Sequence, residues 1–307
     1  MRKICNLFFL ISLMVLADGC SQKKNTEPLS LDVMSFNIWV GGGKSITSTA
    51  RVINESGADI IGIQEATNNG RNVAVAIADS LGWNSYTYSH TAVILSKYPI
   101  IDTSANKCGV KIEIDENHFV WMFNVHLIHC PYEPYQLNNI EYCGAPFLTT
   151  ETEAIASATA SRGEEVDKVI SDIIEVQKQG YPVFLTGDFN EPSALDWTAR
   201  AVEADLCKIP VAWPSTTSFM EKCGLRDSYR TIYPDEVGKP GHTWTTLPET
   251  QAYEEVLDRI DFVLFSGNNN IKATDSRLVG EAGPHSDIHF DDYPSDHRAV
   301  LSSFILP

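Results

Sequence analysis

The stretch Val183-Phe184-Leu185-Thr186-Gly187-Asp188-Phe189-Asn190 decides how this sequence folds. Its first four residues favour a buried β-strand, and the Gly-Asp-x-Asn that follows marks the point where the strand ends. Alone, this turn is more often an Asx-turn, in which the Asp side chain orders its own backbone. Working outward, however, five more apolar runs contain or end at a short polar motif: Ser35-Phe36-Asn37, Gln64-Glu65, Asn124-Val125-His126, Arg259-Ile260-Asp261 and Ser295-Asp296-His297.

Each of these motifs also has an ordinary structural explanation. Asn37 alone could cap the next element, and His126 between two apolar neighbours is usually a satisfied core histidine. Their joint occurrence is harder to explain in that way. Carboxylates, carboxamides and imidazoles gathered at one sheet edge make a site for a hard metal ion and a water-activating base. The sequence therefore predicts the equipment for hydrolysing a phosphate ester.

The remaining patterns predict helices and strands that alternate early, with hairpins throughout. This mixture favours an α/β (α+β) sandwich with largely antiparallel sheets over a doubly wound parallel sheet. Residues 128–150 are irregular and rich in Tyr, Pro and Asn, and we expect this insertion near the mouth of the site. Strands are predicted at 31–38, 58–63, 83–88, 91–95, 107–114, 118–127, 183–186, 260–265, 271–279 and 298–305, and helices at 47–56, 72–81 and 151–179, the last with a break at Gly163.

With these motifs in order, residues 31–305 resemble the endonuclease/exonuclease/phosphatase superfamily, which has the deoxyribonuclease I-like fold. Ile94-Leu95-Ser96-Lys97-Tyr98-Pro99-Ile100 and Gly224-Leu225-Arg226-Asp227-Ser228-Tyr229-Arg230 look like two further landmarks of that family. The resemblance implies a four-layer sandwich, with two mixed, mostly antiparallel sheets flanked by helices. Residues 31–307 would then be one catalytic domain, a phosphoester hydrolase that uses Mg²⁺, with Mn²⁺ or Ca²⁺ as alternatives.

The resemblance also implies a division of roles at the metal. Glu65 and Asp296 would supply oxygen ligands, and Asn37 would complete or orient that shell. Asp188 would orient or deprotonate the attacking water, and Asn190 would help to hold this water and a phosphoryl oxygen. Whether one metal ion acts or two stays open.

Two histidines complete the implied set. His297 would contact the phosphate, with Asp261 fixing its tautomer and raising its basicity. His126 would contact the phosphate and assist the leaving group. Which histidine acts as base and which as electrophile stays open.

The sequence departs from the family pattern beside the expected site. His129 is kept, but Ile128 stands where many members have an acidic residue, and Glu165 stands where the helix usually carries Gln three residues after Arg162. We expect His129, Arg162 and Trp244 to contact the substrate, although Trp244 could equally belong to the core. The insertion's tyrosines, Tyr132, Tyr135 and Tyr142, could stack on a substrate or simply pack the insertion.

Five cysteines lie beyond the first twenty residues: Cys108, Cys130, Cys143, Cys207 and Cys223. Cys130–Cys143 and Cys207–Cys223 could each close a loop, and five buried thiols are the alternative. The N-terminal residues 1–20 resemble a secretory signal that ends in a lipobox-like Ala17-Asp18-Gly19-Cys20, and an ordinary cleaved signal is the alternative. We expect export to the bacterial periplasm or cell surface, a lipid on Cys20, and a polar tether over residues 21–30.

A formal net charge of −17 argues against avid binding of polyanions, because no Lys/Arg-rich run is present. DNA, a phospholipid headgroup and a sugar or inositol phosphate remain candidate substrates, and no stable protein partner is inferred. A catalytically silent lipoprotein that binds a glycan or a partner is the competing hypothesis. It is disfavoured because such proteins typically lose metal or base residues, and here the whole set is present.

Overall fold

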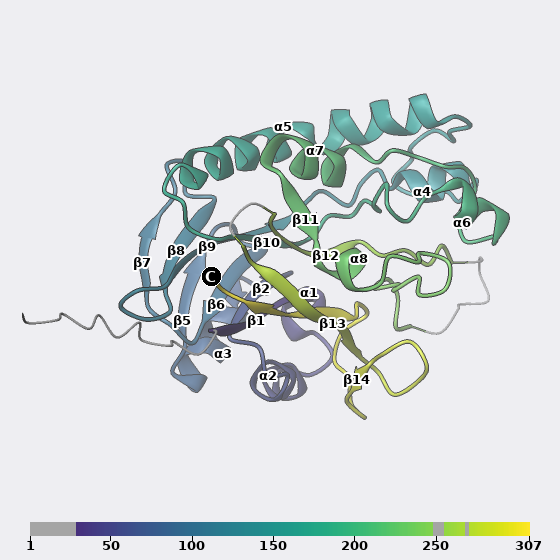
Figure 1. Ribbon diagram of the computed structural model, residues 1–307. Coiled ribbons are helices and arrows are strands. Elements are labelled where there is room, and N and C mark those ends of the chain that lie inside the picture. Colours follow the sequence, from purple (N-terminus) through teal and green to yellow (C-terminus); the bar gives the residue numbers. More distant parts are fainter. Residues whose placement is uncertain (1–28, 248–254, 268–269) are drawn as a thin grey trace, which may run out of the picture.

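Two mixed β-sheets packed face to face form the centre of the protein in this computed structural model (Figure 1). The structure describes residues 29–247, 255–267 and 270–307. The expected signal at 1–20, the lipidation of Cys20 and nearly all of the tether therefore lie outside the described residues. Within those ranges, no helix is both long enough and apolar enough to span a membrane.

The first sheet has seven strands and the second has six. Within the described ranges only three strand pairings, β1/β2, β13/β14 and β9/β10, are parallel, which confirms the expected mixed and mostly antiparallel arrangement. A small pair, β3 (Thr67–Asn68) and β4 (Arg71–Asn72), lies apart from both sheets. The strand order in the first sheet is β14 (Ile288–His289), β13 (Lys272–Gly280), β15 (Ala299–Ile305), β1 (Ser30–Asn37), β2 (Ile60–Gln64), β6 (Ala92–Ser96) and β5 (Asn84–Thr87). The strand order in the second sheet is β11 (Leu225–Asp227), β12 (Asp261–Ser266), β10 (Val183–Asp188), β9 (Phe119–His126), β8 (Gly109–Glu113) and β7 (Ile100–Thr103).

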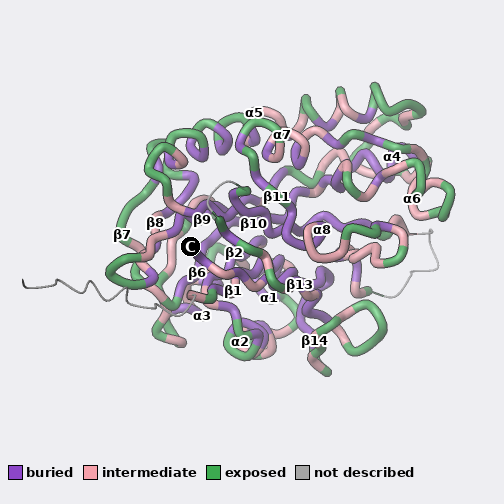
Figure 2. The backbone as a smooth tube through the Cα atoms, in the orientation of Figure 1, coloured by how far each residue is buried: buried purple, intermediate pink, exposed green. Residues whose placement is uncertain are grey.

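Because side chains alternate along a strand, each central strand contributes apolar residues to both faces of its sheet. On β1, Leu31 and Val33 pack between the sheets, whereas Met34 and Phe36 pack on the outer side against helices. Successive side chains of a strand point to opposite faces, so a run that is apolar on both faces must be covered on both. Figure 2 shows the result, with buried backbone along the central strands and exposed positions on the outer helix turns and loops.

Helices cover the outer face of each sheet and complete the four predicted layers. The helices α2 (Ile46–Glu55) and α3 (Val73–Leu81) pack on the first sheet, and α5 (Glu151–Gln177) and α7 (Pro214–Cys223) on the second (Figure 1). A capping box between Thr150 and Glu153 starts α5. The helix runs unbroken through Gly163, so the expected break is wrong. Short helices in the connections had no periodic signal: α1 (Trp39–Gly42), α4 (Glu133–Leu137), α6 (Ala199–Glu203) and α8 (Ser228–Ile232).

A buried polar cluster fixes the two sheets against each other. The Gln64 side-chain amide donates to Asn124 Oδ1 at 2.6 Å, and the Asn124 amide donates to the Ile63 carbonyl at 2.8 Å. Beside them the sheets approach so closely that a Cβ on Gly62 would lie 1.9 Å from Thr186 Oγ1. Because buried amides are costly unless paired, this cluster sets how the strand ends meet across the sandwich.

Candidate active site

The predicted motif residues come together where strand ends from both sheets meet. Parallel β9 and β10 place His126 beside Asp188, and antiparallel β12 places Asp261 opposite Asp188. In the other sheet Asn37 and Gln64 pair across β1 and β2, so that Glu65 follows at the same edge. A cleft of about 410 Å³ opens there, lined by Trp39, Val40, Glu65, His126, His129, Tyr132, Tyr135, Tyr142, Asp188, Asn190, Trp244, Ile260, Asp296 and His297.

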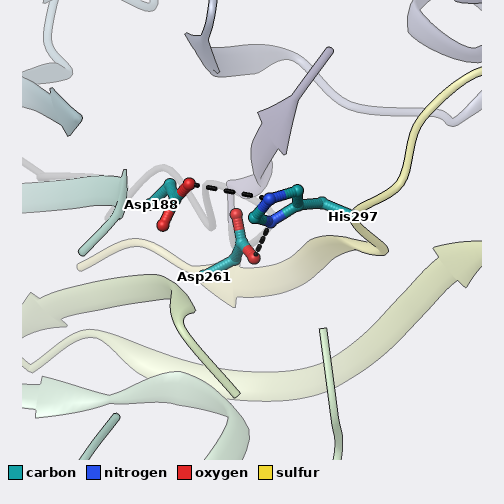
Figure 3. A group of neighbouring side chains, drawn as sticks. All are labelled: Asp188, Asp261 and His297. Atoms are coloured by element: carbon teal, nitrogen blue, oxygen red, sulfur yellow. Dashed lines mark hydrogen bonds and ion pairs between the residues drawn. The ribbon is translucent and has the colours of Figure 1, made fainter. Parts of the chain in front are cut away.

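His297 lies between two buried carboxylates (Figure 3). Its Nδ1 is 2.9 Å from Asp261 Oδ2, and its Nε2 is 3.8 Å from Asp188 Oδ2. Burial alone would lower the pKa of His297, but the charges of Asp261 and Asp188 outweigh it and raise the pKa to about 10. Asp261 is fixed in turn by Thr243, whose Oγ1 accepts from the Asp261 N–H at 3.1 Å. The imidazole is thus held in one orientation with its Nε2 edge lining the cleft.

Asn37 orients the acidic groups from beneath the cleft. Its side-chain amide donates to Asp188 Oδ2 at 2.9 Å and to Glu65 Oε1 at 3.2 Å. Its own Oδ1 accepts from the Trp39 N–H at 2.9 Å, and so is already occupied. Of the two roles left open by the sequence, completing or orienting the metal shell, this geometry favours orienting.

Two groups of side chains could hold a divalent cation. The ligand atoms of Asp188, Asp261 and His297 lie within 4.8 Å of one another, but His297 Nδ1 is already bonded to Asp261 and a protonated imidazole cannot ligate a metal. Also in the cleft lining, Asp296 Oδ1 is buried and has no hydrogen-bond partner among the described residues. Burial raises the pKa of Asp296 to about 6; the charge of His297 opposes this rise and the charge of Glu65 adds to it. An orphaned oxygen in an acidic pocket fits a hard cation. Asp261 Oδ1 also lacks a partner among the described residues, so the better fit of Glu65 and Asp296 rests on His297 being engaged with Asp261.

Asn190 shows that a structural turn and a site residue can be the same residue. Its backbone N–H donates to Asp188 Oδ1 at 2.9 Å, which is the Asx-turn expected from the motif alone. Its φ of 47° and its side-chain bond to the Leu127 carbonyl, 3.0 Å, bring it into the cleft lining. His126 lies on the same side, with Nε2 at 3.7 Å from Asp188 Oδ2.

The insertion forms one wall of the cleft, as its position in the chain predicted. A Cys130–Cys143 disulfide closes it, while Cys108, Cys207 and Cys223 are free. One of the two conceivable bridges is therefore confirmed; a Cys207–Cys223 bridge and five free thiols are both wrong. Tyr132, Tyr135 and Tyr142 stack edge-to-face in sequence, with ring centroids 4.8 and 5.5 Å apart.

Trp244 and His129 lie in the cleft lining, where the sequence placed them. The Trp244 ring is 4.9 Å from the His297 ring and tilted by 57°, so it packs against the central imidazole. The exposed His129 lies next to Tyr142 at 6.3 Å between ring centroids.

Arg162 corrects the sequence prediction, because its side chain does not reach the cleft. It is fully buried in an ion pair with Glu133 at 2.8 Å, and it donates to the Pro131 carbonyl at 2.7 Å. Glu191, directly after Asn190, lies 3.9 Å away. An arginine on the buried face of α5 must find internal partners, and here these are the start of the insertion and the loop after Asp188. Arg162 is a positioning residue.

Two cleft residues, Trp39 and Val40, had no motif to mark them. Both have left-handed backbone, with φ of 49° and 48°, and both line the cleft next to Glu65. The Val40 N–H donates to Glu65 Oε2 at 2.5 Å, which ties this turn to the acidic group. The following run Gly41-Gly42-Gly43 was the signal that an unusual turn follows the first strand.

Comparison with known proteins agrees with this geometry. The chain matches the Endonuclease/Exonuclease/phosphatase family over residues 34–297. The uncharacterized protein F14F9.5 of Caenorhabditis elegans is 26% identical over an alignment 328 residues long, gaps included, that covers 97% of this chain and 99% of that protein. An AP endonuclease from Archaeoglobus fulgidus has the same fold, with a TM-score of 0.56, 14% identity, and coverage of 89% of this chain and 98% of that one. So does the human Nocturnin catalytic domain with a bound sulfate anion, with a TM-score of 0.55, 12% identity, and coverage of 92% and 97%.

Proposed function

We propose that this chain, which belongs to the Endonuclease/Exonuclease/phosphatase family, is a divalent-metal-dependent phosphoester hydrolase, with Mg²⁺ as its ion. The observation that carries the proposal is the Asp188–His297–Asp261 arrangement beside an orphaned Asp296 oxygen. Attack by water on phosphorus requires a base, a positive charge beside the phosphate and a ligand for a metal ion. Asp188, His297 and Asp296 would supply these three in that order. The complete set of core residues also disfavours a silent binding protein.

Glu65 and Asp296 would hold the metal ion, which would neutralise the phosphate charge and acidify the attacking water. Asp188 accepts the proton from this water as the new P–O bond forms, because its Oδ1 and Oδ2 are kept in place by Asn190 and Asn37. The ester P–O bond breaks, and the leaving oxygen takes a proton from His126 or from water.

His297 stabilises charge on the phosphoryl oxygens in this scheme. A pKa of about 10 keeps the imidazole protonated near neutral pH, so Nε2 can donate to an oxyanion. Asp261 fixes the Nδ1 proton and balances the positive charge at 2.9 Å. The histidine is therefore an electrophile here, which leaves the role of base to Asp188.

Hydrolysis of bis-p-nitrophenyl phosphate and p-nitrophenyl phosphate by the purified protein, with Mg²⁺ or with EDTA, tests the proposal. We expect metal-dependent release of p-nitrophenolate that Asp188→Asn abolishes without changing the circular dichroism spectrum. A diester preference would direct the search to DNA or a phospholipid headgroup, and a monoester preference to sugar or inositol phosphates. Equal rates with Mg²⁺ and EDTA, or in the variant, would refute the proposal.

We further propose that the protein is exported and anchored by a lipid on Cys20. The Cys130–Cys143 disulfide supports this, since such bridges persist in oxidising compartments. Mass spectrometry of the membrane fraction should find a lipid-modified Cys20 as the first residue, and Cys20→Ser should release the protein. An unmodified Cys20 in mature protein would contradict the anchor.

A further inference from the structure

The insertion wall contributes three tyrosines to the cleft lining, and the hydroxyls of two of them are engaged away from the cleft. Tyr132 donates its hydroxyl to Asp258 at 2.6 Å, and Tyr135 donates its hydroxyl to Glu255 at 2.6 Å. Neither acceptor belongs to the cleft lining, whereas both tyrosines do. The surface that Tyr132 and Tyr135 offer to a ligand is therefore ring carbon, which recognises another ring by stacking rather than by hydrogen bonds.

The charge of the lining limits how many phosphates a ligand carries. Among the described residues no lysine or arginine lines the cleft, whereas Glu65, Asp188 and Asp296 do. A divalent cation held by Glu65 and Asp296 would be the main source of positive charge at this lining, and it would compensate one phosphate group. A second phosphate would face uncompensated carboxylates on a protein that already carries a net charge of −17.

The wall is also held in place before any ligand arrives. The Cys130–Cys143 disulfide closes it, and Arg162 anchors it to α5 through Glu133 and the Pro131 carbonyl. Tyr132 and Tyr135 are 5% and 6% exposed, so their rings cannot turn away without unpacking the insertion. Binding to such a surface costs little ordering entropy, which favours selection of ligands by shape.

From these observations, and resting on the proposed function, we infer that the cleft selects esters with a single phosphate and an uncharged planar ring. The phosphate would lie at a cation held by Glu65 and Asp296 and beside His297, and the ring would pack on the wall formed by Tyr132, Tyr135 and Tyr142. A nucleobase and a simple aryl group share this chemistry, whereas the flanking phosphates of a long DNA strand do not fit it.

Calorimetric titration in the presence of Mg²⁺ tests this inference with three single-phosphate probes: phenyl phosphate, cyclohexyl phosphate and ribose 5-phosphate. The Asp188→Asn protein is used so that the probes are not consumed. We expect phenyl phosphate to bind about fivefold tighter than either other probe, because a stacked aromatic pair contributes beyond its buried area. A nucleoside 5′-monophosphate that binds tighter still would identify the ring as a nucleobase.

Variants of Tyr142 assign the preference to the wall. This ring is half-buried and its truncation disturbs the fold least. In the same background, Tyr142→Ala should remove most of the phenyl preference and Tyr142→Phe should retain it. The matched control is Tyr181→Ala, another half-buried ring, which packs on Phe119 with centroids 5.5 Å apart and does not line the cleft.

Equal binding of cyclohexyl and phenyl phosphate, or an unchanged preference in Tyr142→Ala, would overturn the planar-ring selection. Tighter binding of a DNA 20-mer than of phenyl phosphate at 0.15 M salt would overturn the single-phosphate limit. Because these experiments measure binding and not turnover, the inference and the proposed function can fail separately. Turnover without a ring preference would refute only the inference. A ring preference without turnover would refute only the hydrolase proposal.

Discussion

The cleft has two contrasting sides. One is the set of strand ends that carries Asp188, Asp261 and His297, called here the catalytic edge, and the other is the insertion wall. They are built in different ways. At the edge, Asn37 and His297 lie 260 residues apart and are brought within 3.5 Å by the pairing of two sheets. In the wall, Cys130 and Cys143 are 13 residues apart, and side-chain bonds hold the segment to its surroundings. The edge thus depends on the global fold, whereas the wall is a local structure fastened to it. Chemistry and substrate selection are separable in such a molecule.

Asp261→Asn should give the largest effect, at the catalytic edge. The variant removes the charge that fixes and balances His297, so we expect kcat for bis-p-nitrophenyl phosphate to fall on the order of 10³-fold with KM little changed. Asp275→Asn, on a half-buried aspartate of β13 that pairs with Arg277 and does not line the cleft, is the matched control and should keep the wild-type kcat. A fall of less than threefold in Asp261→Asn would place the chemistry elsewhere.

Arg162→Met should give the next largest effect, now at the base of the wall. Removing the guanidinium leaves Glu133 buried without its ion-pair partner, which should lower the free energy of unfolding by about 3–4 kcal/mol. Urea denaturation measures this loss, and adding Glu133→Gln should recover part of it. Arg200→Met removes an exposed arginine that pairs with Asp235 and with Glu236, and it should cost only about 1 kcal/mol. Equal losses in the two arginine variants would contradict a buried anchor.

Replacing both Cys130 and Cys143 by Ser tests the wall without touching its aromatic rings. A loop of this length predicts a loss of about 2–3 kcal/mol in the free energy of unfolding. We also expect a higher KM for aryl esters, because the wall must then be ordered upon binding. Cys207→Ser, at a free thiol, is the control. An unchanged KM would show that the tyrosines are held without the bridge.

Glu191→Gln should give the smallest effect, seen in the pH dependence of stability. Burial raises the pKa of Glu191 from 4.5 to about 7, although Arg162 and the Ser215 N–H oppose the rise. Stability from this group is therefore complete below pH 4.5 and is lost as pH rises through about 7. The variant stays neutral, so its Tm should gain on wild type by about 2 °C between pH 5 and pH 8. Glu221→Gln, at an exposed residue, is the control. Parallel curves of Tm against pH for Glu191→Gln and wild type would contradict the prediction.

These two regions also differ in how far the sequence predicts them. The edge was predictable because each site residue sits beside a strand with a clear apolar pattern, as His126 follows Phe119–Val125. Pairing of these strands then brings the ends together without further information. The mixed, mostly antiparallel sheets followed from the same patterns, whereas the four layers were implied by the family resemblance.

The wall could not be predicted in this way, because residues 128–150 have no periodic pattern. Their partners are Arg162, Glu255 and Asp258, which lie far along the chain and carry no motif for this contact. The prediction for Arg162 was wrong for the same reason. The family motif suggested a substrate contact, whereas the side chain lies on the buried face of α5 and contacts the insertion. Cysteine spacing alone likewise could not choose between the two loops.

The central claim is that the catalytic edge performs the chemistry and the insertion wall selects the substrate. A double-mutant cycle on bis-p-nitrophenyl phosphate hydrolysis with Mg²⁺ tests this claim most directly. Wild type, Asp261→Asn, Tyr142→Ala and the double variant are compared in kcat and KM. We predict that Asp261→Asn lowers kcat, that Tyr142→Ala raises KM, and that the two free energies add within about 0.5 kcal/mol. A fall in kcat for Tyr142→Ala as large as that for Asp261→Asn, or strong coupling between them, would contradict the account.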